Sequence, residues 1–311
     1  MADKDEISAE EIPFPVVYTG MGKMNPSYTS PVYEVIVERD IPYASTTGYW
    51  THSPVGDRRT TARLLFHIGS PKPVTLGMDI YLPEGDDSPK RPLLLMMHGG
   101  SFFIGNKGEK GQSGWCRYFA SLGYVAASID YRLGFHPVKS EVRKAEQRAL
   151  EDAEAALKYL LGRVDLRIDR DRIFAAGTSA GAITALSLAY GPHPGFPIRA
   201  VANLWGSVHD LSVLERANVP ILSFQSSGDP LMPYEKGYPF RKLRILSGLV
   251  SDYMYGTHAI HEKALSLGIR AEHHPCPEPR HCLHLDDSLE YTPRFAEIRD
   301  AMATFFAAEM K

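Results

Sequence analysis

The pentapeptide Gly177-Thr178-Ser179-Ala180-Gly181 constrains the fold of this chain more than any other segment. Residues 172–176 before it are typical of a short buried strand, and residues 182–189 after it are typical of a helix. A serine flanked in this way predicts a very tight turn that lifts its hydroxyl clear of a sheet. Small residues are needed in such a turn because bulky side chains would clash where the strand and the helix cross. G-x-S-x-G alone also occurs by chance, so its surroundings decide its meaning.

Those surroundings predict an α/β fold. From residue 92 onward, short apolar segments alternate with longer helical ones, which is typical of a parallel sheet covered on both faces. We therefore expect a mostly parallel central sheet of about eight strands with helices on both faces. The expected strands are 32–37, 62–68, 74–82, 93–98, 125–130, 172–176, 199–204, 220–225 and 269–274, and the clearest helices are 139–162 and 293–310. The composition of residues 43–59 does not indicate whether they form a helix, a strand or a loop.

Length and composition predict one globular domain. The chain has 311 residues, of which 44% are hydrophobic and 23% charged, so it can bury a large core. Residues 1–30 show no periodicity and are expected to form an N-terminal arm, leaving 31–311 as a single domain. A formal net charge of -3 gives no reason to expect nucleic acid or an acidic membrane as a partner.

No apolar run approaches the roughly 18 residues that span a bilayer. The first residues are polar and lack the apolar core of a signal peptide, so a cytoplasmic location is expected. An exported protein whose leader had been removed would look the same. The sequence does not predict an oligomeric state.

Acyl transfer by a serine requires a base, a carboxylate that orients the base, and donors for the developing oxyanion. Around a turn of this kind, the chain order is serine, then Asp or Glu, then His. Asp229 directly follows the expected strand 220–225, so its carboxylate is expected at the sheet edge where Ser179 lies. Asp252 and Asp210 are weaker candidates, and a structural aspartate that caps a turn is the alternative.

The base is expected in the loop before the last helix. His281 and His284 both lie there, whereas His273 and His274 fall in or at the end of the last strand and are expected to be structural. We favour His281 because Pro277 and Pro279 stiffen the loop just before it. His284 is the alternative, but Asp286 and Asp287 nearby are expected to engage it and raise its pKa, which hinders a base.

The oxyanion donors are expected to be backbone amides. One is the N–H of Ala180, the residue after the serine, and the others belong to the loop His98-Gly99-Gly100-Ser101-Phe102. Glycines there let the backbone approach a substrate closely. The donors are expected to be Gly100 and Ser101, with a shift toward Phe102 as the alternative.

The same C-terminal histidines, together with Cys276 and Cys282, offer soft ligands that suit zinc. The paired C-x-x-C spacing of zinc sites is missing, so we expect no metal. A disulfide between Cys276 and Cys282 is possible over so short a loop, but reduced thiols are favoured in a cytoplasmic protein.

Three motifs in order, His98-Gly99-Gly100, Ser128-Ile129-Asp130-Tyr131-Arg132-Leu133 and Gly177–Gly181, resemble the esterase/lipase branch of the α/β-hydrolase superfamily, near the hormone-sensitive-lipase-like carboxylesterases. The resemblance covers roughly residues 75–311. It implies a carboxylic-ester hydrolase without a cofactor, acting on small to medium uncharged esters. Three departures from the family pattern stand out. Ser101 replaces a third glycine, no long helical cap is expected ahead of the first strand, and Arg280 stands where such esterases carry Gly before the histidine.

Residues 231–257, rich in aromatics, are the expected wall of the substrate pocket, or else a packed connection. The expected pocket residues are Phe102, Trp205 and Tyr234. An amidase or peptidase on the same fold is the alternative activity. A third possibility is a binding protein that keeps the fold without catalysis. The presence of Ser179, Asp229 and His281 in the required order argues against it.

Overall fold

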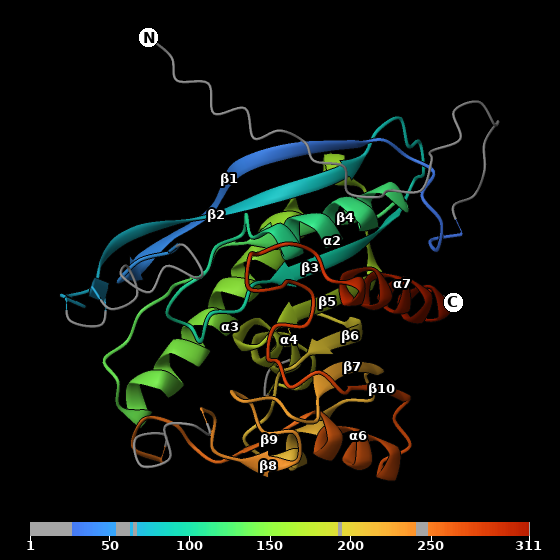
Figure 1. The fold of residues 1–311 in the computed structure, drawn as a ribbon. Helices are drawn as coiled ribbons and strands as arrows, with labels where there is room; N and C mark the ends of the chain where they lie inside the picture. The colour runs from blue at the N-terminus through green and yellow to red at the C-terminus, as the bar shows by residue number, and fades with distance from the viewer. Residues whose placement is uncertain (1–26, 54–62, 65–66, 192–194, 241–247, 311) are drawn as a thin grey trace.

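An eight-stranded sheet forms the centre of the computed structural model, which describes residues 27–53, 63–64, 67–191, 195–240 and 248–310 (Figure 1). The first two strands run antiparallel to their neighbours, and the remaining six are parallel to one another. In spatial order the strands are β1 (Val35–Gly48), β2 (Lys72–Pro83), β4 (Val125–Ile129), β3 (Arg91–Met97), β5 (Ile168–Thr178), β6 (Ile198–Leu204), β7 (Ile221–Ser226) and β10 (Ala271–Cys276). This confirms the mostly parallel sheet that the alternating pattern predicts.

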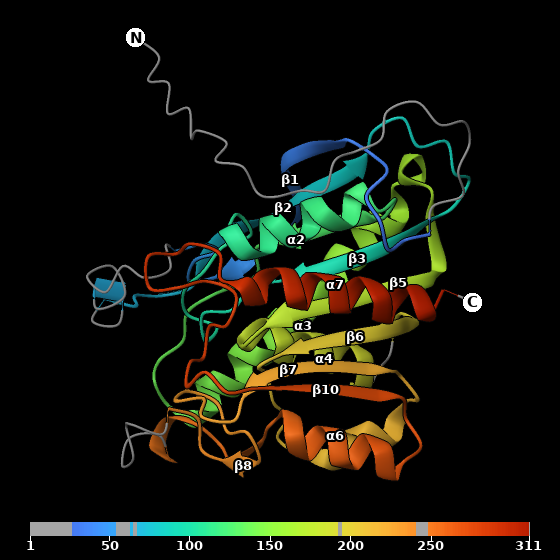
Figure 2. The same ribbon diagram turned by 45° about the vertical axis from the view of Figure 1, so that its right-hand side comes forward.

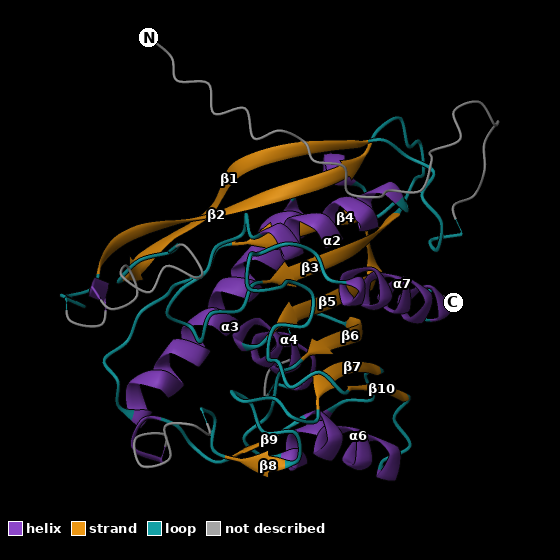
Figure 3. Cartoon of the chain, viewed as in Figure 1, coloured by secondary structure: helices purple, strands orange, loops and turns teal. Residues whose placement is uncertain are grey.

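Helices cover both faces of the sheet (Figures 2 and 3). One face packs against α2 (Lys110–Ser121) and α7 (Pro293–Ala308). The other packs against α3 (Lys139–Gly162), α4 (Ala180–Tyr190) and α6 (Thr257–Ser266). Short elements complete the connections: η1 (Val164–Leu166), η2 (Leu211–Arg216) and the two-stranded pair β8 (Lys236–Gly237) and β9 (Met254–Tyr255).

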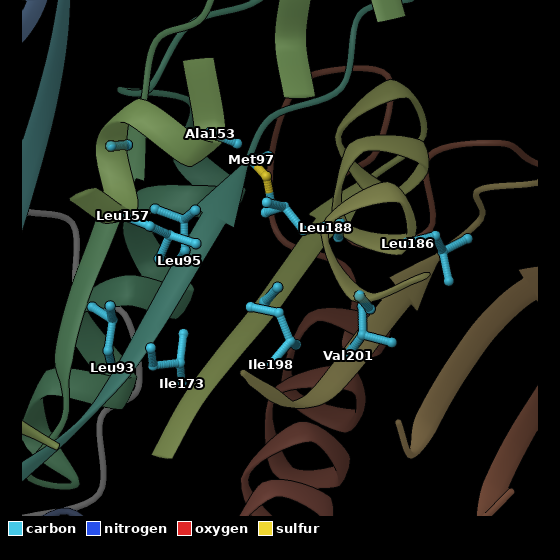
Figure 4. Close-up of a cluster of buried hydrophobic side chains, with 14 of the residues drawn as sticks. Leu93, Leu95, Met97, Ala153, Leu157, Ile173, Leu186, Leu188, Ile198 and Val201 are labelled. Carbon is cyan, nitrogen blue, oxygen red and sulfur yellow. The ribbon is translucent and has the colours of Figure 1, made fainter. Parts of the chain in front are cut away.

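Strand β3 shows how the sequence pattern produces two cores. All seven of its residues are buried, and the side chains alternate between the faces. Leu93, Leu95 and Met97 pack toward α3 and α4, where Ala153 and Leu157 meet them (Figure 4). Leu94 and Met96 face α2 and α7 instead. Since full burial of a leucine stabilises a fold by about 1.5–3 kcal/mol, a strand buried on both sides fixes the centre of the sheet firmly.

The pentapeptide forms the expected tight turn between β5 and α4. Ser179 has φ +51° and ψ -116°, a conformation that costs a non-glycine residue about 1–3 kcal/mol. A Cβ on Gly177 would lie 2.3 Å from the carbonyl carbon of Gly181, and a Cβ on Gly181 would lie 2.2 Å from the carbonyl oxygen of Met97. Both glycines are therefore required by the close approach of β3, β5 and α4.

The expected helix 139–162 matches α3 at both ends, but the first strands differ from the prediction. The strand expected at 32–37 is β1, and it continues to Gly48 through part of the segment that composition left unassigned. Its length is explained by pairing with β2 along nearly the whole of both strands. Of the strand expected at 62–68, the described residues 63–64 and 67–68 are not in a strand.

The N-terminal arm expected at 1–30 lies mostly outside the described residues, so the division into an arm and one domain stays a prediction. Within the described ranges, none of the helices has the length and apolar character needed to traverse a bilayer.

Replacing Gly181 by alanine is expected to destabilise the protein by about 3 kcal/mol, because the new Cβ would collide with the backbone oxygens of Met97 and His98. Urea unfolding followed by circular dichroism measures the change. Gly162→Ala is the matched control: Gly162 ends α3 with open space around it, so alanine there should be neutral or stabilising by up to about 1 kcal/mol. A Gly181→Ala protein as stable as the wild type would contradict the close-approach argument.

Candidate active site

Ser179 lies at the carboxyl edge of the sheet, at the start of α4. Its N–H donates to the carbonyl oxygen of Leu204 at 2.9 Å, which ties the turn to the end of the neighbouring β6. The residue is only 9% exposed, so its hydroxyl is reached through a cavity rather than from open solvent. The turn therefore presents one hydroxyl in a fixed place.

Asp229 lies in the turn after β7, as expected from its position behind that strand. One carboxylate oxygen, Oδ1, accepts the N–H groups of Leu231 at 2.8 Å and Met232 at 3.0 Å. The other, Oδ2, accepts the side-chain amide of Gln225 at 3.2 Å. The side chain is completely buried. Aspartate is favoured in turns because its carboxylate can accept hydrogen bonds from backbone N–H groups two or three residues further along the chain. Here these hydrogen bonds fix the direction of the carboxylate.

His281 connects Asp229 to Ser179. Its Nδ1 lies 2.8 Å from Oδ2 of Asp229, and its Nε2 lies 2.9 Å from Oγ of Ser179. A carboxylate only accepts hydrogen bonds, so Nδ1 carries the proton and Nε2 presents a lone pair to the serine hydroxyl. The structure thus brings together the three residues that the sequence singled out.

Arg280, the departure before this histidine, holds the loop in place. Its guanidinium donates to the carbonyl oxygen of Leu285 at 3.2 Å and to the carboxylate of Asp287 at 2.8 Å. Pro279 packs against Gly228 beside Asp229, where a Cβ on the glycine would lie 3.2 Å from the proline. The two loops that carry Asp229 and His281 are therefore in direct contact.

His284, the alternative base, is buried between aromatic rings. Its ring lies 4.7 Å from that of Trp115 and 5.4 Å from that of Trp205. Burial lowers the pKa of His284 to about 3. Our expectation that Asp286 and Asp287 would raise this pKa is wrong, because both carboxylates engage other groups: Asp286 caps its own turn, and Asp287 pairs with Arg280. No hydrogen bond joins His284 to Ser179 in the described part of the chain.

The loop His98–Gly105 lies against Ser179. A Cβ on Gly99 would lie 3.4 Å from the Cβ of Ser179, and Gly100 has φ +101° with space for no Cβ at all. Ser101 and Phe102 both have positive φ, at 56° and 58°. Three consecutive residues in this region make a sharply curved backbone, which is a costly arrangement for the two that are not glycine.

Tyr131 supports the loop His98–Gly105 through contacts with His98. Its hydroxyl donates to the carbonyl oxygen of His98 at 2.8 Å, and its ring stacks on the His98 imidazole at 4.3 Å. Burial lowers the pKa of His98 to about 4, so this histidine stays neutral and donates from Nδ1 to the carbonyl oxygen of Gly99 at 2.7 Å. Tyr131 belongs to the second of the three motifs noted in the sequence, Ser128–Leu133, but its support of the loop was not foreseen.

A cavity of about 120 Å³ opens onto Ser179. Ser101, Phe102 and Ala180 lie on its wall, so the curved loop and the turn face the same space. Much of the remaining wall is apolar and comes from α3 and from residues 231–257: Val142, Met232, Phe240, Val250 and Met254. The segment 231–257 therefore contributes to the pocket wall as expected, through residues that include the aromatic Phe240 but not Tyr234.

Two expected pocket residues lie elsewhere. Trp205 is buried behind the site, edge-on to His281 and stacked on His284. Tyr234 stacks on His258 and packs against the tilted ring of His273, away from the cavity, because its segment turns toward α6. Of the rival carboxylates, Asp252 lines the cavity and pairs with Arg143 at 2.6 Å, whereas Asp210 caps η2.

Gln225 is the residue near this site that sequence reasoning missed. Besides donating to Asp229, it accepts from Thr257 Oγ1 at 2.8 Å and donates to the carbonyl oxygens of Met232 and Pro233. The amide thus joins β7, the turn after it and the start of α6. A long polar side chain near the end of an expected core strand was the available signal.

Cys116, Cys276 and Cys282 are all free thiols. Cys282 instead lies 3.5 Å from Nδ1 of His284. Across the described ranges, no group of three or more His, Cys, Asp or Glu side chains is arranged to hold a metal ion.

Comparisons with known proteins agree with this fold. A family model described as BD-FAE matches residues 78–194. Gut esterase 1 of Caenorhabditis elegans is 33% identical over 107 residues, which cover 33% of this chain and 19% of that protein. Putative esterase NocK of Nocardia uniformis subsp. tsuyamanensis is 28% identical over 191 residues, covering 58% of this chain and 52% of the relative. The chain thus spans about half or less of the length of these curated relatives.

Among solved structures, Thermogutta terrifontis esterase 2 phosphorylated by paraoxon is similar, with a TM-score of 0.57 and 20% sequence identity. The match covers 76% of this chain and 89% of that one. At this identity the likeness shows the fold, an α/β-hydrolase fold.

The buried histidines predict a loss of stability in acid. In the unfolded chain a histidine takes up a proton below about pH 6.5, whereas in the folded chain His284 stays neutral down to about pH 3. The unfolded state then binds more protons, so the free energy of unfolding falls by up to about 1.4 kcal/mol per pH unit for this residue.

Replacing His284 by phenylalanine, which keeps an aromatic ring between the two tryptophans, should remove that contribution. Urea titrations from about pH 6 to about pH 4 should then show a smaller loss of stability in the variant than in the wild type. Equal pH dependence in both proteins would show that His284 is not held neutral by burial.

Proposed function

We propose that this chain, which belongs to the esterase/lipase branch of the α/β-hydrolase superfamily, is a serine carboxylic-ester hydrolase. The observation that carries the proposal is the continuous hydrogen-bond path from Asp229 through His281 to Ser179. The path ends at a hydroxyl that faces a largely apolar cavity. A hydroxyl, a base and an orienting carboxylate at these distances are the requirements for an activated serine nucleophile.

In the first half of the reaction, Oγ of Ser179 attacks the acyl carbon of the ester while its proton moves to Nε2 of His281. Asp229 keeps Nδ1 protonated and stabilises the imidazolium that forms. Because this carboxylate already has its remaining lone pairs engaged by Gln225 and two backbone amides, it does not need to reorganise during the transfer. The imidazolium then returns the proton to the leaving alcohol.

The acyl group is now on Oγ of Ser179, and a water molecule repeats the attack with His281 again acting as the base. The carboxylic acid leaves and the serine is regenerated. Each half of the reaction passes through a tetrahedral oxyanion.

The donors proposed for this oxyanion are the backbone amides of Gly100, Ser101 and Ala180. Ser101 and Ala180 both lie on the wall of the cavity that Ser179 faces. The positive φ angles of Gly100 and Ser101 turn successive amides of this loop. Removal of a single oxyanion donor typically lowers the rate by about 10²–10³. Phe102, which follows with the same backbone curvature, remains the alternative donor.

Small to medium uncharged esters are the proposed substrates, since the cavity is narrow and mostly apolar. The relatives support the same class of chemistry: two of them are named as esterases, and the similar Thermogutta protein is an esterase phosphorylated by paraoxon.

Replacing Ser179 or His281 by alanine should lower kcat for p-nitrophenyl butyrate by about 10⁴ or more, because each change breaks the same proton path. The drop should be similar for the two variants and not additive in the double variant. Steady-state kinetics on folded proteins, checked by circular dichroism, provide the measurement.

His284→Phe is the matched control for His281. It removes the other histidine of the loop but keeps a ring against Trp115 and Trp205, so most of the activity should remain. If His281→Ala retained activity and His284→Phe abolished it, the base would be His284 and the proposed path would be wrong. Activity of Ser179→Ala above a tenth of the wild type would refute the serine mechanism.

A further inference from the structure

A second cavity, of about 530 Å³, lies beside the cavity that holds Ser179. The two cavities have part of their walls in common. The residues on both walls are Arg143, Glu146, Ile183 and His209. Two spaces that have four wall residues in common are separated only by the thickness of those side chains.

Helices α3 and α4, which lie side by side in Figure 1, show how the two cavities follow each other. Along α4, Ser179 and Ile183 border the first cavity, whereas Ile183 and Tyr190 border the second. With a rise of about 1.5 Å per residue, Ile183 is about 6 Å and Tyr190 about 16 Å beyond Ser179 along the helix axis.

Helix α3 repeats this order. Its Val142 borders the first cavity, and Gln147 and Leu150, further along the helix, border the second. The second cavity is therefore the continuation of the space in front of Ser179 between these two helices.

Two of the four shared residues, His209 and Glu146, contact each other across the partition. Nε2 of His209 lies 2.8 Å and 3.1 Å from the two carboxylate oxygens of Glu146. Both side chains are mostly buried, with 18% and 14% exposed. His209 comes from the loop after β6, where the adjacent Val208 is fixed by two backbone hydrogen bonds to Tyr255. The pair thus links α3 to the opposite wall.

Nδ1 of His209 is buried and has no hydrogen-bond partner in the described part of the chain. The first cavity is largely apolar, whereas polar and apolar side chains both line the second. A buried histidine whose second nitrogen is unsatisfied is an energetically expensive residue to place at the boundary of the apolar cavity. Packing alone would be served better by an aliphatic side chain, so the pair is better explained as a selective barrier than as a stabilising contact.

We propose that the His209–Glu146 pair limits the length of the aliphatic chain, acyl or alcohol, that the site accepts, by closing it off from the second cavity. This inference rests on the proposed ester hydrolysis. Esters whose chain ends before Ile183 and His209 fit the first cavity, and longer ones require the second.

The test is the double variant His209→Ala/Glu146→Ala, which opens the partition without leaving an unpaired carboxylate. Its kcat/KM is measured for p-nitrophenyl acetate, butyrate, octanoate and laurate, and for acetate esters of ethanol, butanol and octanol. In one of the two series, the ratio of the longest to the shortest substrate should rise by at least about tenfold over the wild type, since a newly fitted methylene alone is worth about tenfold or more. If the double variant does not fold, His209→Ala/Glu146→Gln, which removes the ring and replaces the carboxylate by a neutral amide, should shift the ratio in the same direction.

Two matched variants separate an opened partition from a general loosening. Gln147→Ala alters only the second cavity and should keep the wild-type chain-length profile. Ser187→Phe, placed in the double variant, fills the second cavity from α4 and should restore the preference for short chains. A folded double variant that hydrolyses acetate esters with an unchanged profile in both series would overturn the proposal. Wild-type protein that hydrolyses none of these esters would instead overturn the proposed function, and the chain-length assignment with it.

Discussion

The close crossing of β3, β5 and α4 is the contact on which the site depends. Gly177 and Gly181 let the backbone of the turn approach itself and the end of β3 within distances that exclude any side chain. That approach holds Ser179 at positive φ, a conformation which the surrounding buried strands must stabilise. Because β3 also leads into the loop His98–Gly105, the same crossing sets the serine hydroxyl and the curved backbone loop beside each other. The strained turn therefore holds the Ser179 hydroxyl in one fixed position at the edge of the sheet.

Much of this arrangement could be predicted because it follows from chain order. Residues after successive parallel strands meet at one edge of a sheet, so Asp229 behind β7 and His281 behind β10 were expected near Ser179. The tight turn and the buried strands could also be predicted, because each is recognised from a few neighbouring residues: the glycines around Ser179 and the short apolar segments. The preference for His281 over His284 agrees with the geometry, but the reason differs: His284 is excluded by burial between Trp115 and Trp205, rather than by nearby carboxylates.

The rest depends on contacts between residues far apart in the sequence. Nothing near Tyr234 indicates that its ring packs against His258 and His273, and nothing near Gln225 indicates that it joins Asp229 to α6. The continuation of β1 to Gly48 required its pairing with β2 to be known. The cavity wall was predicted only in part: Phe102 and the segment 231–257 line it as expected, whereas Val142 was missed because it comes from α3, far away in the sequence. The surroundings of a side chain depend on residues that become neighbours only after folding, so they could not be predicted from the sequence in the way that the order of the strands along the chain could.

The most direct test of an activated serine at the end of this path is covalent. A fluorophosphonate reacts with a nucleophilic hydroxyl, and peptide mapping by mass spectrometry locates the adduct. The account predicts a single adduct on the peptide that contains Ser179, and none on folded Ser179→Ala protein. An adduct on a different residue with Ser179 unmodified, or no reaction of the folded wild-type protein, would contradict it.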